Sequence, residues 1–127
     1  MKSSNWNYYS VKIIKQIMVL GKPDPDLIDE FYGDDGKQHF EESLMLVHAQ
    51  SPEHAYKIAQ KIAIKDEKPY PNKYGEQVIW KFIKAVDCYM ILDKLTSGTE
   101  LYSCLHTVDK YESAIDFIDK WFRRSDE

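Results

Sequence analysis

The residues of this chain best suited to chemistry are carboxylates, and they are concentrated in one stretch from Pro23 to Glu42. The eight acidic residues there are Asp24, Asp26, Asp29, Glu30, Asp34, Asp35, Glu41 and Glu42. With Lys37 as the one cation, the stretch carries a net charge of −7, whereas the whole chain carries −4. Subtraction leaves the remaining residues at about +3. Such a local acidic patch predicts a surface that attracts a positively charged partner.

Carboxylates beside a histidine could also hold a divalent metal ion, and this is the alternative function. The candidate ligands are Asp34, Asp35, His39 and Glu41. His39 and Glu41 would share a face of an extended strand. However, no pair of histidines in the chain has the spacing typical of zinc sites, and Pro25 interrupts the pattern of a calcium loop. A solvated acidic segment without a cofactor is therefore the favoured interpretation.

Nucleophilic catalysis is not indicated, although an enzyme remains an open alternative. Ser103 and His106 are three residues apart on a predicted strand, so they point to opposite faces and do not form a dyad with each other. Cys88 and Cys104 match no zinc or redox spacing and are expected to be reduced thiols. The five glycines are scattered, which is unlike a phosphate-binding loop.

The elements that position the acidic stretch are predicted from periodicity. Strands are predicted at residues 8–20 and 38–49, where β-branched and aromatic residues are frequent. The acidic segment between them, residues 21–38, contains three glycines and two prolines and is predicted to be a loop or lid. Ser51 as an N-cap and Pro52 at the first helical position then predict an amphipathic helix.

The second half of the chain predicts a hairpin and a final helix. Residues 77–92 form the longest apolar run, and the turn at residues 96–98 leads to a second strand at 99–108. The pair Asp109 and Glu112 is typical of a capping box and predicts a C-terminal helix at about 110–123. The expected fold is a single α+β domain over residues 1–127. Its antiparallel sheet of about four strands carries two helices on one face, in the order β-β-α-β-β-α.

Five short blocks of sequence also carry a resemblance. They are Tyr9-Ser10-Val11-Lys12, Phe40-Glu41-Glu42-Ser43, Ala49-x-Ser51-x-Glu53-x-Ala55, Asn72-x-Tyr74-Gly75-Glu76 and Gly98-Thr99-Glu100-x-Tyr102-Ser103. Together they are similar to a bacterial family of small proteins described only as a domain of unknown function, DUF4288, over about residues 8–103. The resemblance implies a stand-alone domain without known chemistry, and it supplies no catalytic residue.

The function predicted from these patterns is non-catalytic protein interaction. A basic partner would be steered by the acidic loop and anchored by tyrosines, which are favoured at interface centres. The candidate contact residues are Asp29, Glu30, Asp34, Asp35, Glu41, Glu42, Tyr70 and Tyr74. The most concrete form of this hypothesis is an immunity protein that masks a basic toxin.

Location and other partners follow from composition. No signal peptide and no run of eighteen apolar residues is found, so a cytoplasmic protein without membrane partners is expected. Lysines at 57, 61, 65 and 68 follow one side of the predicted helix. However, a sequence pI of about 5.6 makes nucleic-acid binding an unlikely third function. Homo-oligomerisation through the sheet is a further possibility, which an exposed apolar face would indicate.

Overall fold

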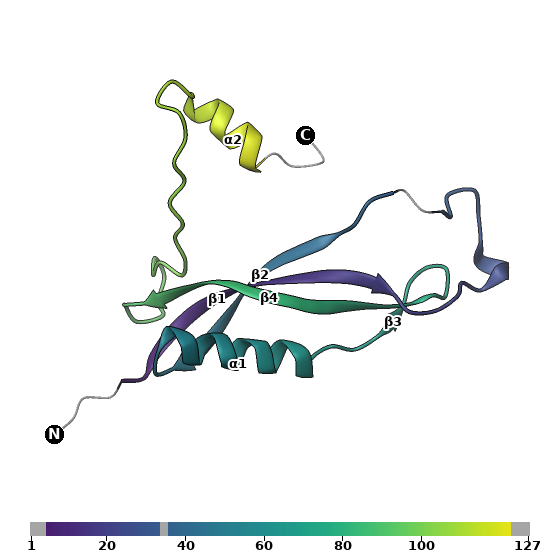
Figure 1. Ribbon diagram of the computed structural model, residues 1–127, viewed down its shortest axis with the longest axis horizontal. Coiled ribbons are helices and arrows are strands. Elements are labelled where there is room, and N and C mark those ends of the chain that lie inside the picture. Colours follow the sequence, from purple (N-terminus) through teal and green to yellow (C-terminus); the bar gives the residue numbers. More distant parts are fainter. Residues whose placement is uncertain (1–4, 34–35, 123–127) are drawn as a thin grey trace.

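The centre of the molecule is a four-stranded antiparallel sheet with strand order β2-β1-β4-β3 (Figure 1). The computed structural model describes residues 5–33 and 36–122. The strands are β1 (Asn7–Val19), β2 (Phe40–Ala49), β3 (Tyr70–Pro71) and β4 (Gln77–Ile91), and the helices are α1 (Pro52–Lys65) and α2 (Ala114–Phe122). The predicted α+β class and the order β-β-α-β-β-α are confirmed.

β1 lies between two long partners and holds the sheet together. Tyr9 is opposite Val47 of β2, and Val11 is opposite Cys88 of β4. Because strand side chains alternate between faces, Tyr9, Val11 and Ile13 all point to the same side, where they are fully buried. Two register shifts interrupt the pairing of β1 with β4, between Lys12 and Ile13 and again two residues later. These bulges increase the local twist of the sheet.

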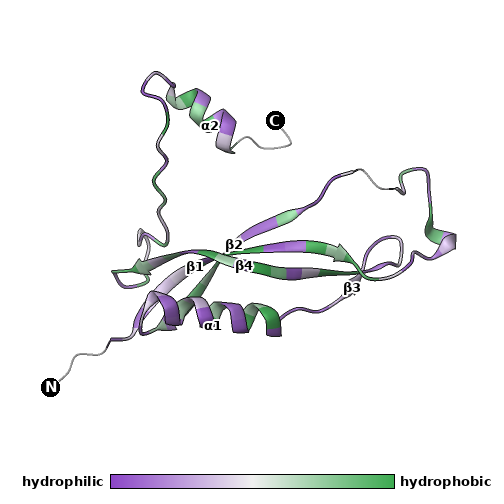
Figure 2. Cartoon of the chain, viewed as in Figure 1, coloured by the Kyte–Doolittle hydropathy of each residue, from purple (hydrophilic) through white to green (hydrophobic). Residues whose placement is uncertain are grey.

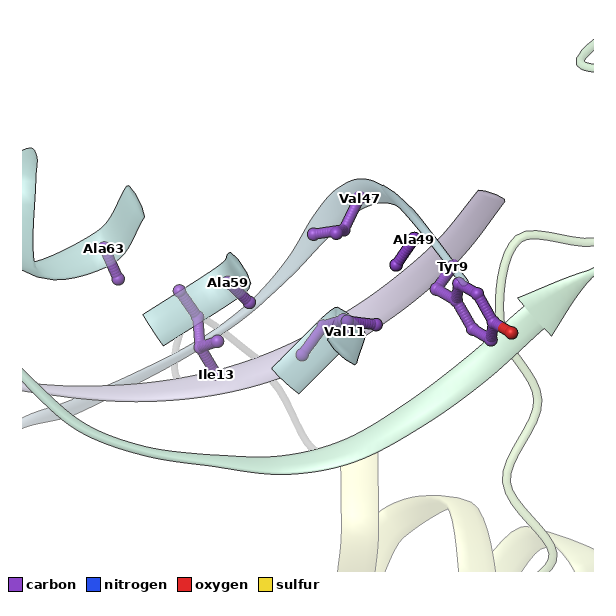
Figure 3. Close-up of a cluster of buried hydrophobic side chains, with 8 residues drawn as sticks. Tyr9, Val11, Ile13, Val47, Ala49, Ala59 and Ala63 are labelled. Atoms are coloured by element: carbon purple, nitrogen blue, oxygen red, sulfur yellow. The ribbon is translucent and has the colours of Figure 1, made fainter. Parts of the chain in front are cut away.

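α1 covers the face of the sheet to which these side chains point (Figure 3). The helix begins as predicted, because the Oγ of Ser51 accepts a hydrogen bond from the backbone N–H of His54 at 3.1 Å. Its buried residues are Ala55, Ala59 and Ala63. These small side chains let the helix axis approach the sheet closely. Apolar and polar residues alternate along α1 in Figure 2, as expected for a helix with one buried stripe.

The predicted strand at residues 99–108 is wrong. The structure has no strand there, and the fourth strand is instead β3, in which Tyr70 pairs with Val78 of β4. Residues 99–102 approach β4 through side chains: the Tyr89 hydroxyl donates to Oε1 of Glu100 at 2.5 Å, and the Tyr102 hydroxyl donates to Oδ2 of Asp87. The chain therefore crosses the sheet face opposite α1 instead of extending its edge.

α2 begins four residues later than predicted and has a different cap. The Oγ of Ser113 accepts from the backbone N–H of Asp116 at 3.1 Å, whereas Asp109 accepts from the N–H of Tyr111 in a separate turn. Among the described residues, no strand and no other helix contacts α2, which stands away from the sheet (Figure 1). The expectation of two helices packed on one face thus holds for α1 only. On the opposite face of the sheet, here called the open face, no helix of residues 5–33 and 36–122 is packed.

Candidate interaction surface

The acidic loop is fixed to the turn that joins β3 to β4. The backbone N–H of Asp24 donates to the carbonyl of Tyr74 at 2.8 Å, and the Asp24 carboxylate caps a 3₁₀ turn at Pro25–Leu27 by accepting from Asp26 N–H at 2.9 Å. Gly75 makes the close approach possible. Its φ is +77°, and a Cβ at this position would lie 3.2 Å from the Cβ of Asp24. A side chain here would both strain the backbone and push the loop away.

Asp29 and Tyr74 form the centre of this docking. The Tyr74 hydroxyl donates to Oδ1 of Asp29 at 3.0 Å, and the same oxygen accepts from the backbone N–H of Phe31 at 3.0 Å. The Tyr74 hydrogen bond is the main reason that the pKa of Asp29 is lowered. Asp29 therefore stays ionised. The Lys73 ammonium lies 4.8 Å from the centre of the Tyr74 ring, which adds a cation–π contact to the same cluster.

A second pair of contacts holds the far side of the loop. The Tyr32 hydroxyl donates to Oε2 of Glu76 at 3.3 Å, and the rings of Tyr32 and Tyr74 pack edge to face with centroids 4.9 Å apart. Asn72 stiffens the turn beneath them, since its Oδ1 accepts from the N–H groups of both Tyr74 and Glu76. The acidic loop is thus attached at several points and is not a free lid.

The predicted contact residues fall into two groups. Asp29 and Tyr74 are in direct contact, and Glu30 is exposed beside them. Tyr70 lies at the β3 edge, where its hydroxyl accepts from Nε1 of Trp80 at 3.1 Å. Glu41 and Glu42 lie on β2, at the opposite edge of the sheet, with β1 and β4 in between. Asp34 and Asp35 are outside the described residues.

Glu42 is already paired with a lysine of the same molecule, so its carboxylate is less available to a binding partner. Its Oε1 is 2.5 Å from the Nζ of Lys12 on β1. This hydrogen-bonded ion pair is the main cause of the raised pKa of Lys12. Glu41 follows the other face of the strand by alternation. The eight residues therefore do not make one surface. The loop group around Asp29 and Glu30 is the compact one.

Two of the four candidate ligands of the alternative metal site lie in the described part of the chain. Asp34 and Asp35 lie outside the described residues, whereas His39 and Glu41 are at the start of β2. Within residues 5–33 and 36–122, no group of three or more His, Cys, Asp or Glu side chains is placed to hold a metal ion. The two cysteines are free thiols. Cys88 is half-buried, and burial is the main reason for the raised pKa of its thiol, while Cys104 is exposed.

Sequence reasoning missed a polar cluster on the open face. The Tyr102 hydroxyl binds Asp87, and the Lys12 ammonium lies 4.4 Å from the centre of the Tyr102 ring. These contacts pin residues 92–102, here called the strap, across the sheet. Beside the strap lies a cavity of about 670 Å³, lined by Ser10, Leu44, Leu46, Ile91, Leu95 and Leu101 together with the strap turn at 96–99. The one sequence signal was that Glu100 and Tyr102 belong to one of the five blocks that carry the resemblance noted in the sequence.

Comparison with known proteins gives a family. The model for the Domain of unknown function (DUF4288) matches residues 8–103. The chain belongs to this family. The match runs from the start of β1 to the residue after Tyr102, so it includes the sheet, α1, the acidic loop and the strap, and leaves α2 outside. No curated protein and no solved structure matches the chain. No helix in the described residues is long and apolar enough to cross a membrane.

Proposed function

We propose that this DUF4288 protein is a cytoplasmic, non-catalytic interaction domain that binds a basic protein partner at its acidic loop, in the manner of an immunity protein that masks a toxin. The observation that carries the proposal is the docking of the loop onto residues 72–76. The contacts of Asp24, Asp29 and Tyr32 fix the backbone of the loop between residues 24 and 32, so the carboxylates of that part are presented in one arrangement. A pre-arranged loop loses little conformational entropy on binding.

The charge of the loop would act mainly on association. The stretch from Pro23 to Glu42 carries eight carboxylates against one lysine, while the rest of the chain is weakly basic. A surface of this kind accelerates encounter with a basic partner, and salt screens the effect over about 10 Å at 0.1 M ionic strength. The exposed side chains of Phe31, within the loop, and of Tyr70, on β3, supply apolar contact area that slows dissociation.

The first experiment is affinity capture of the partner from a host lysate, followed by stopped-flow association kinetics with the purified partner. The loop variant combines Asp26→Asn with Glu30→Gln, two exposed residues whose carboxylates make none of the docking bonds described above. The matched control combines Asp66→Asn with Asp93→Asn, which removes the same charge from exposed positions outside the loop.

The loop variant should lower the association rate constant roughly tenfold at low salt, and the difference should shrink at high salt. The dissociation rate constant should change little. Equal association rates and equal salt dependence for the loop variant and the control would show that the acidic loop is not the binding surface.

A further inference from the structure

The open face of the sheet presents exposed apolar side chains beside the strap, where no helix or strand covers them within the described part of the chain. On β2, Leu44 and Leu46 are 48% and 50% exposed, and Phe40 is 56% exposed. These residues alternate with Val47 and Ala49, which are buried under α1. Next to them is the cavity of about 670 Å³ beside the strap. Exposed apolar side chains gathered beside a cavity are a feature of interaction sites in soluble proteins.

α2 is an apolar helix without a surface to pack on. Two of its apolar residues are more than half exposed, Ile115 at 71% and Ile118 at 52%, whereas Phe117 is partly buried against His106. Trp121 and Phe122 are similarly exposed, although His106 packs against one side of their rings at centroid distances of 5.6 and 6.1 Å. A nine-residue helix is marginal in water unless tertiary packing supports it. Among the described residues, α2 therefore has no strand or other helix to pack on.

The geometry of the chain separates these two surfaces within one molecule. The contact of Tyr102 with Asp87 fixes the end of the strap on the open face. From there, residues 103–122, here called the arm, leave the sheet and carry α2 away from it (Figure 1). Each molecule thus holds one uncovered apolar face and one uncovered apolar helix. If two molecules exchange arms around a two-fold axis, the apolar helix of each molecule covers the apolar face of the other.

We propose that α2 of one molecule packs on the open face of a second copy, so that the protein is a dimer with exchanged arms. Nine helical residues extend about 13 Å at 1.5 Å per residue. On the open face, Leu44 and Leu46 of β2 lie beside the cavity, whereas Phe40 is separated from them by Glu42, which is paired with Lys12. The cavity beside Leu44 and Leu46 is large enough to take bulky side chains of the stripe, such as Ile118 and Trp121.

This dimer leaves the acidic loop accessible. The loop is docked at the end of the sheet where β4 begins, whereas the cavity lies where β4 ends, near Ile91 and Leu95 (Figure 1). The two surfaces are independent. Loss of dimerisation would not by itself remove the binding of a basic partner, and loss of that binding would not test the dimer.

Sedimentation equilibrium over a range of protein concentrations tests the proposal. The unchanged protein should be a dimer. Ile118→Asp on α2 and Leu46→Asp on the open face should each weaken the dimer at least tenfold. Ile64→Asp is the matched control, because Ile64 is 50% exposed on α1 and should leave the dimer unchanged. Circular dichroism checks that each variant is folded. A monomer at every concentration, or a dimer unaffected by both substitutions, would overturn the proposal.

Disulfide trapping distinguishes exchange from closure of the arm on its own sheet. In a Cys104→Ser background, a Leu46→Cys chain is mixed with an Ile118→Cys chain of different mass. A disulfide joining the two different chains supports arm exchange. A single chain with both substitutions should likewise link to other copies. If it closes on itself at low concentration instead, α2 is a lid for its own molecule and the proposal is wrong.

Discussion

Tyr102 connects the strap to the sheet through two charged neighbours. Its hydroxyl donates to Asp87, and Lys12, which is paired with Glu42, lies over its ring. The bond from Tyr102 is the main cause of the lowered pKa of Asp87, and the backbone N–H of Cys88 adds to it. Burial and the same bond raise the pKa of Tyr102. Both shifts show that the pair is stabilised as carboxylate and neutral phenol.

We expect Tyr102→Phe to lower the free energy of unfolding by about 1.5–3 kcal/mol at pH 7, the usual value for a hydrogen bond to a charged group. A lowered pKa in the folded state stabilises above the unfolded value of about 3.9 and is lost as the pH falls through the folded value. The difference from the unchanged protein should therefore narrow below about pH 4. Urea denaturation of both proteins across pH 3–8 measures this difference in the free energy of unfolding.

Tyr111→Phe is the control for this experiment, because Tyr111 is 84% exposed and should lose no stability on losing its hydroxyl. A difference for Tyr102→Phe that stays constant from pH 3 to pH 8 would mean that Asp87 does not depend on this bond.

The candidate site illustrates what a sequence can predict at the scale of residues. Asp29 and Tyr74 were each predicted from residue type, but they are 45 positions apart, and only the fold brings them into contact. Tyr102 was not predicted as a site residue because it falls in a segment that reads locally as a strand. Its role depends on contacts with Asp87 of β4 and Lys12 of β1.

At the scale of elements, the close packing of α1 on the sheet depends on the small size of its buried side chains. Ala55 and Ala59 are completely buried against β1 and β2, with no space between helix and sheet for larger groups. Ala59→Leu should therefore force α1 from the sheet and reduce the free energy of unfolding by about 1–3 kcal/mol. Gln60→Leu, at an exposed neighbouring position, should have little effect. Thermal denaturation of both variants checks this. Equal melting temperatures would contradict close packing at Ala59.

Elements with a strong local signal were predicted and those defined by distant contacts were not. β1, β2 and β4 match their predicted ranges within two residues at each end, and α1 begins at the predicted Pro52, because periodicity and caps lie within each segment. β3 has two residues, one of them Pro71, which is too short for any alternation. Residues 99–108 have β propensity. However, the side chains of residues 99–102 bind the open face of the sheet instead of forming a strand. The register shifts in β4 also disturb the strand that residues 99–108 would have paired with.

At the scale of the whole molecule, stability should be distributed unevenly. β1 is hydrogen-bonded on both sides, so its backbone amides should exchange most slowly with deuterium. Amides between Ser103 and Ser113 lie outside the sheet and should exchange fastest. If arms are exchanged, protection of α2 should also rise with protein concentration while protection of β1 stays constant. Mass spectrometry at two concentrations measures this. Slow exchange at 103–113 in dilute solution would contradict an arm that leaves the sheet.

The strand order determines when this domain can fold during its synthesis. Tyr8 pairs with His48 on one side and with Ile91 on the other, so the first strand made must wait for the last one. Until β4 leaves the ribosome, β1, β2 and α1 can associate, but one long edge of β1 has no partner. Unpaired strand edges on nascent chains are prone to aggregation. The growing chain would therefore benefit from chaperone protection at that edge until Ile91 has emerged.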